Sequence, residues 1–226
     1  MEKRVLLLHG FNKNSRDMQT LSTYLEHLGF QCRSLDLPLT YHEFDQSLYD
    51  VEKHLSDMVS KKDGPIHLVG HSTGGLLIRK VLQESQWMDS IGHCVQIATP
   101  NKGSQLAYVA SKISGYTEYY RTLRSLNATY IEQLNLPDVT PFSIGAIAGN
   151  RNHLWLGMLL RGENDGRIEL SSVYYPGLAD FITLPYGHKE IHHQKEVAEL
   201  TARFLRTGHF KYIFFYLKKF TALITL

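Results

Sequence analysis

One short segment constrains the fold of this 226-residue chain more than any other. Residues 66–69 form an apolar, strand-like run that leads directly into Gly70-His71-Ser72-Thr73-Gly74 and then into a helical pattern. Glycines at this spacing indicate a sharp strand-to-helix turn, because side chains at positions 70 and 74 would collide with the neighbouring strand and helix. Such a turn would lift the Ser72 hydroxyl above the sheet edge as a candidate nucleophile. It would also place the Thr73 N–H at the positive end of the helix, as a candidate oxyanion donor.

The rest of the chain alternates between strands and helices. We expect strands at 4–8, 31–35, 66–69, 93–98, 142–148 and 181–184, and helices at 17–28, 42–60, 74–84 and 190–205. This alternation predicts an α/β fold with a mostly parallel sheet and helices on both of its faces. The length fits a single domain at 1–209, with an insertion at about 103–141 that we interpret as a small helical cap.

Composition and charge exclude several other classes of protein. Hydrophobic residues make up 43% and charged residues 20%, which is typical of a globular domain and not of a disordered chain. The net charge is +2 and the basic residues are scattered, so we expect no nucleic acid partner. The first apolar run is too short for a signal peptide, and Cys32 and Cys94 lie in strand-like runs, where a free thiol is usually buried. These features favour a cytoplasmic location.

Loops on either side of the serine offer a second oxyanion donor and an acid. The run 4–8 ends in His9-Gly10-Phe11, where the Phe11 N–H is the candidate donor; an ordinary turn with a permissive glycine is the alternative. The acid should follow the serine on a loop after a late strand. This order favours Asp165, which stands in a turn-like stretch after the apolar run 154–160, with Glu163 and Asp180 as alternatives.

The general base should be a histidine in the loop after the last strand. His188 follows the strand-like run 181–184 in this way. The chain has 12 histidines, and the nearest rivals, His192 and His193, lie in or at the start of a helical pattern, where they are less able to reach Ser72. Asp165 would hold the His188 tautomer, while His188 takes the serine proton and returns it to the leaving group.

Two segments outside these loops are rich in aromatic residues. In the insertion, Tyr116, Tyr119 and Tyr120 are candidates for lining a substrate site, although packing of the insertion onto the sheet would explain them equally. The tail 210–226 is apolar, but Lys218 and Lys219 divide it below the length of a membrane span. We expect this tail to dock on the core, lie at a membrane surface or pair with another chain.

The chain resembles bacterial-type lipases and esterases of the α/β-hydrolase fold from about residue 5 to residue 210. The resemblance lies in His9-Gly10-Phe11, Gly70-His71-Ser72-Thr73-Gly74-Gly75, Ala98-Thr99-Pro100-Asn101-Lys102-Gly103-Ser104, Asn164-Asp165-Gly166 and Gly187-His188. It implies an open sheet, a small cap after residue 104 and a catalytic triad of Ser72, Asp165 and His188. Arg167-Ile168-Glu169 departs from the apolar pair that is common after the Asp-Gly of these enzymes.

The expected reaction is hydrolysis of a carboxylic ester of an apolar acid through an acyl-Ser72 intermediate, without a metal or an organic cofactor. An acyl thioesterase or an acyltransferase would use the same residues. A binding protein that retains the fold without turnover is a further alternative. The expected partner is a small-molecule or lipid ester, and the tail offers a route to peripheral membrane contact.

Overall fold

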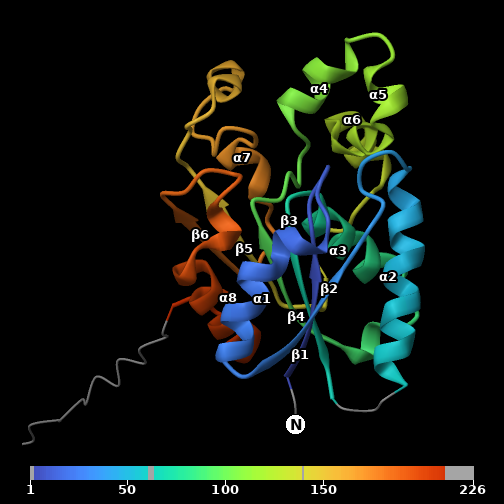
Figure 1. Cartoon of the computed structure of the whole chain (residues 1–226), viewed down its shortest axis with the longest axis vertical. Helices are drawn as coiled ribbons and strands as arrows, with labels where there is room; N and C mark the ends of the chain where they lie inside the picture. Colours follow the sequence, from blue (N-terminus) through green and yellow to red (C-terminus); the bar gives the residue numbers. More distant parts are fainter. Residues whose placement is uncertain (1–2, 61–63, 139, 212–226) are drawn as a thin grey trace, which may run out of the picture.

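The structure is a computed structural model that describes residues 3–60, 64–138 and 140–211. Within these residues, six parallel strands form one sheet in the order β2-β1-β3-β4-β5-β6 (Figure 1). The strands are β1 (Lys3–Leu8), β2 (Phe30–Leu35), β3 (Ile66–His71), β4 (Ile91–Ile97), β5 (Ile144–Gly149) and β6 (Asp180–Leu184). All six expected strands are confirmed, and the expected parallel sheet is present.

Helices cover both faces of the sheet because its strands are apolar on both sides (Figure 1). The covering helices are α1 (Gln19–His27), α2 (Phe44–Val59), α3 (Thr73–Glu84) and α8 (Lys195–Thr207). In β1, Val5 and Leu7 pack with residues of α1 and α8, whereas Leu6 and Leu8 pack with residues of α2 and α3. All four side chains are fully buried, as the alternation of side chains along a strand requires.

Short 3-10 helices precede two of these helices. The expected helix 17–28 is divided into η1 (Ser15–Met18) and α1. The expected helix 190–205 is interrupted because Gln194 is extended, with φ −83° and ψ 134°. The 3-10 helix η5 (Ile191–His193) therefore lies between the end of β6 and α8, and it follows closely on the loop that carries His188.

Two segments stand above the carboxyl ends of the strands (Figure 1). The expected cap is indeed largely helical, and it contains α4 (Gln105–Ser111), α5 (Tyr116–Tyr119), η3 (Arg121–Leu126) and α6 (Ala128–Gln133). Opposite the cap, the connection from β5 to β6 contains the 3-10 helix η4 (Trp155–Leu159). The same connection ends with α7 (Leu170–Val173). A further short 3-10 helix, η2 (Met88–Ser90), lies between α3 and β4.

The described chain ends just beyond α8. Phe210 is fully buried and packs on Phe204, with ring centroids 4.8 Å apart, so this residue belongs to the packed core. The expected docking or membrane contact of the tail falls on residues 212–226, which lie outside the described part of the chain. Among the described residues, no helix has the length and apolar character that crossing a membrane requires.

Candidate active site

Ser72 is the single residue that joins β3 to α3. Its backbone angles, φ 53° and ψ −120°, lie in a region that residues with side chains rarely adopt. A Cβ atom at Gly70 would lie 2.4 Å from the carbonyl carbon of Gly74, and a Cβ atom at Gly74 would lie 2.3 Å from the carbonyl oxygen of Leu8. The expected reason for the two glycines, a turn too close to its neighbours for side chains, is therefore confirmed.

The structure brings Ser72, His188 and Asp165 together. Ser72 Oγ lies 3.1 Å from His188 Nε2, and His188 Nδ1 lies 2.7 Å from Asp165 Oδ2. The three residues are 7%, 5% and 1% exposed, so the contacts are largely shielded from water. A hydroxyl, an imidazole and a carboxylate in this order can activate the hydroxyl as a nucleophile.

Backbone groups hold the Asp165 carboxylate in place. Its Oδ1 accepts hydrogen bonds from the Arg167 N–H at 2.9 Å and from the Ile168 N–H at 2.8 Å. The His188 N–H donates to the Asp165 carbonyl oxygen at 2.8 Å, which ties the two loops together. Oδ2 is thus left pointing at the imidazole, which fixes the orientation of the ring.

The alternative acids and bases lie elsewhere. Glu163 is exposed, and Asp180 stands at the amino end of β6, where its carboxylate accepts from the Phe181 and Phe210 N–H groups. Ser72 follows the carboxyl end of β3, at the opposite edge of the sheet. His192 lies beside Asp17, with its Nε2 3.0 Å from the carboxylate, and His193 stacks on His192.

The two expected oxyanion donors lie on loops that follow the neighbouring strands β1 and β3. Thr73 is the first residue of α3, so its N–H has no acceptor within the helix. Phe11 lines the same cavity as Ser72, and within the described residues no hydrogen bond uses its N–H. Both groups are therefore available to a ligand, and their role as oxyanion donors stays a prediction.

A cavity of about 450 Å³ opens beside Ser72 and His188. One wall comes from the cap, the other from η4 and the segment after Asp165, and the rim carries basic side chains. The apolar lining residues are Phe11, Leu106, Ala107, Val109, Ala110, Ile113, Tyr116, Leu123, Leu126, Leu156, Leu159 and Ile168; the basic residues are Lys13, Arg167 and Lys189. A second cavity of about 490 Å³, between the start of α4 and α7, is lined by none of Ser72, Asp165 and His188.

The expectation for the cap tyrosines needs correction. Only Tyr116 lines the cavity. Tyr119 is 61% exposed, and Tyr120 packs against Phe11 and Tyr41, with ring centroids 5.9 and 5.8 Å away. Because α5 is a single turn, its tyrosines pack on one another and on these neighbours instead of facing the cavity together.

Sequence reasoning missed the wall formed by η4. Leu156 and Leu159 line the cavity, while Trp155 and Met158 are more than two-thirds exposed beside them. The available signal was the apolar run 154–160, which was interpreted only as the segment that precedes the acid. Its 3-10 conformation is what divides the run between the cavity and the surface.

Comparison with solved structures identifies the fold. The mature form of Bacillus licheniformis lipase BlEst2 superposes with a TM-score of 0.78 at 18% identity, over 92% of each chain. Aspergillus fumigatus lipase B gives a TM-score of 0.67 at 12% identity, over 91% of this chain and 52% of that one. The metagenomic carboxyl esterase MGS0156 gives 0.64 at 15% identity, over 82% and 64%. At these identities the likeness shows the fold alone, and that fold is the α/β-hydrolase fold.

Comparison of the sequence identifies the family. A search of curated proteins finds no match. Residues 4–135, which are more than half of the chain and include Ser72, match the family model described as palmitoyl protein thioesterase. With the α/β-hydrolase fold and the expected resemblance to lipases and esterases both confirmed, the chain is a hydrolase that belongs to the palmitoyl protein thioesterase family.

Proposed function

We propose that this hydrolase cleaves esters of apolar carboxylic acids through an acyl-Ser72 intermediate. The observation that carries the proposal is the continuous chain of contacts from Ser72 Oγ through His188 to Asp165 beside an apolar cavity. The volume of about 450 Å³ lies within the range of pockets that bind small organic ligands. An acyl chain is favoured over a charged acid because aliphatic side chains dominate the lining.

The reaction proceeds in two half-reactions. His188 Nε2 takes the proton of Ser72 Oγ as the oxygen attacks the carbonyl carbon, and the N–H groups of Thr73 and Phe11 stabilise the oxyanion. His188 then gives the proton to the leaving group, whose bond to the acyl carbon breaks. In the second half, His188 takes a proton from water as the oxygen of that water attacks the acyl carbon. The bond from the acyl carbon to Ser72 Oγ then breaks, Oγ takes the proton from His188, and the free acid leaves. Asp165 stabilises the imidazolium in both halves.

A thioester is the second candidate substrate, and the family match is the observation that favours it. The acyl half of the reaction is unchanged, because the same residues attack the carbonyl and stabilise the oxyanion. A thiolate also leaves more readily than an alkoxide, so the same constellation suffices. An acyltransferase would differ only in the acceptor of the second half-reaction.

The free thiols of Cys32 and Cys94 support the cytoplasmic location that we also propose.

Hydrolysis of two substrate series tests the proposal. p-Nitrophenyl esters from acetate to palmitate and acyl-coenzyme A thioesters of the same chain lengths are compared for the wild type and Ser72→Ala, with circular dichroism to show that both are folded. We expect turnover that Ser72→Ala abolishes, together with labelling of Ser72 by a fluorophosphonate. The ratio of kcat/KM between the two series shows whether an ester or a thioester is the preferred substrate. Formation of a new ester when an alcohol is added would reveal acyl transfer. A folded wild type that turns over neither series and takes no label would refute the proposal.

A further inference from the structure

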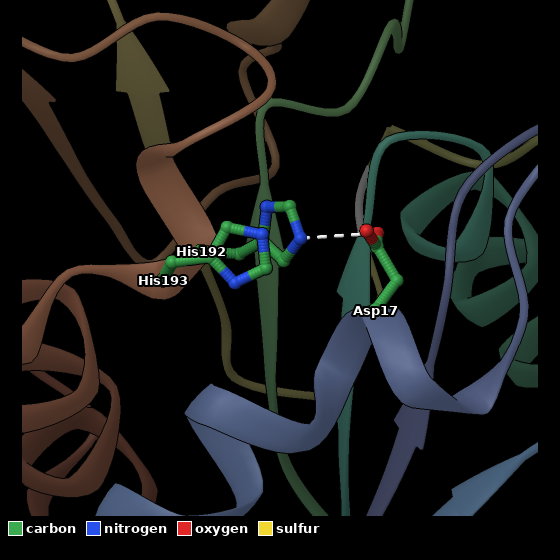
Figure 2. A group of neighbouring side chains, drawn as sticks. All are labelled: Asp17, His192 and His193. Atoms are coloured by element: carbon green, nitrogen blue, oxygen red, sulfur yellow. Dashed lines mark hydrogen bonds and ion pairs between the residues drawn. The ribbon is translucent and has the colours of Figure 1, made fainter.

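Three imidazole rings and a carboxylate gather next to the Ser72 turn. Asp17 comes from η1, His71 is the last residue of β3, and His192 and His193 belong to η5. The ring centroids of His71 and His192 are 3.8 Å apart, and those of His192 and His193 are 4.0 Å apart. Figure 2 shows the His192 ring between the His193 ring and the Asp17 carboxylate, with one nitrogen of His192 directed at that carboxylate. The proposed reaction uses none of Asp17, His192 and His193.

The Asp17 carboxylate is a charged group with one oxygen directed into this cluster. Oδ1 accepts from Lys13 Nζ at 2.7 Å, and Oδ2 lies 3.0 Å from His192 Nε2. Oδ2 also lies 3.9 Å from His71 Nδ1, so this oxygen faces two imidazole rings.

His71 faces Asp17 with an unpaired ring nitrogen. Its Nε2 lies 3.1 Å from the His188 carbonyl oxygen, a contact that requires the ring hydrogen on Nε2. With its hydrogen on Nε2, the neutral ring carries a lone pair on Nδ1. Nδ1 is buried and has no hydrogen-bond partner among the described residues. A lone pair and a carboxylate oxygen thus face each other without a hydrogen between them, an arrangement that a cation would stabilise.

We propose that Asp17, His192 and His193 bind a divalent transition-metal ion of the Zn²⁺ type. One ligand atom from each of the three residues lies within 4.8 Å of the others. Metal–ligand bonds of about 2.0–2.1 Å in a tetrahedral site place ligand atoms about 3.3 Å apart, so closing the site requires rotation of the imidazole rings about their side-chain bonds. Imidazole nitrogens with one carboxylate suit Zn²⁺, whereas Mg²⁺ and Ca²⁺ prefer oxygen ligands.

Formation of the site needs no change in net protonation. The hydrogen on His192 Nε2 moves to Nδ1, which has no partner among the described residues, and Nε2 then offers its lone pair to the metal. Lys13 keeps its contact with Oδ1 while Oδ2 ligates. The ion would join η1 to η5, which closely follows the loop that carries His188. Binding to the folded state alone stabilises that state, with a rise of roughly 5–10 °C in melting temperature at a hundredfold excess of free Zn²⁺ over Kd.

Zn²⁺ binding to the purified full chain tests the site. ZnCl₂ is titrated in equilibrium dialysis with metal analysis, and melting temperatures are measured with ZnCl₂, with MgCl₂ and after chelation. The test variants are Asp17→Asn and His193→Gln; His27→Gln removes an exposed imidazole from the last turn of α1 and serves as the matched control. We expect one Zn²⁺ per chain with the thermal shift, a loss of affinity of tenfold or more in both test variants, and none in the control.

The opposite results would overturn the inference. They are the absence of saturable binding, equal binding by His193→Gln and the wild type, or an equal thermal shift with MgCl₂. Because Asp17 also accepts the His192 hydrogen bond, Asp17→Asn could fail to fold. In that event the His193→Gln variant alone tests the site. His193 Nδ1 has no hydrogen-bond partner among the described residues, so replacing His193 breaks no described hydrogen bond at that atom. If His27→Gln lowers the Zn²⁺ affinity as much as His193→Gln does, the ion binds to histidines in general and not to the proposed site.

Discussion

Replacing Asp165 by asparagine separates the charge of the proposed acid from its shape. Oδ1 accepts two backbone N–H groups, those of Arg167 and Ile168. If the new amide turned its NH₂ group toward these donors, two buried hydrogen bonds would be lost at roughly 1–3 kcal/mol each. The amide oxygen therefore keeps the Oδ1 position, and the nitrogen takes the place of Oδ2, 2.7 Å from His188 Nδ1.

This geometry forces the wrong tautomer on His188. The amide donates to Nδ1, so the ring hydrogen moves to Nε2 and faces Ser72 Oγ, where it cannot take the serine proton. We expect kcat to fall by about 10⁴-fold, equivalent to about 5 kcal/mol of lost transition-state stabilisation. The measurement is kcat on a p-nitrophenyl ester that the wild type hydrolyses, with urea unfolding to confirm that Asp165→Asn is folded.

Asp180→Asn is the matched control. Its carboxylate also accepts two backbone N–H groups, but it lies at the amino end of β6, away from Ser72. We expect kcat within about threefold of the wild type for this variant, because no proposed catalytic group contacts it. The assignment of Asp165 is refuted if folded Asp165→Asn retains more than a tenth of the activity, or if Asp180→Asn loses as much.

Three further predictions follow from the same structure. Gly74→Ala places a Cβ atom 2.3 Å from the Leu8 carbonyl oxygen, so we expect a loss of about 3 kcal/mol in the free energy of unfolding, measured in urea; a loss under about 1 kcal/mol would contradict the described turn. Ala110→Phe narrows the cavity on its cap side, so the chain-length optimum of ester hydrolysis should move to shorter acids while acetate ester turnover stays within about threefold; an unchanged optimum would remove Ala110 from the acyl site. Burial lowers the pKa of His67 from 6.5 to about 4 in the folded chain. As the pH falls, His67 therefore becomes protonated in the unfolded chain at a higher pH than in the folded chain. We expect this residue to cost about 2 kcal/mol of stability between pH 7 and pH 5, and His67→Gln should flatten the pH dependence of unfolding by that amount; parallel pH profiles would contradict it.

Much of the candidate site follows from local sequence and chain order. The glycines at positions 70 and 74 mark the Ser72 turn in the sequence: a side chain at 70 would meet the start of α3, and a side chain at 74 would meet the end of β1. The alternation of strands and helices implies parallel strands, whose carboxyl ends meet at one edge of the sheet. This is why Phe11, Asp165 and His188 could be selected by their positions after strands, and why Asp180, before a strand, lies on the other side.

Other features are decided only by packing between distant segments. The cap forms the wall of the cavity opposite Leu156 and Leu159, and Tyr120, which follows α5, packs on the distant Phe11 and Tyr41. The cluster of Asp17, His71 and His192 joins positions up to 175 residues apart, and no local pattern relates them. By itself the sequence determined the nucleophile turn, the sheet and the order of the candidate catalytic residues. The tertiary structure alone decided the cavity walls and the histidine cluster, because contacts between remote side chains depend on how whole elements pack.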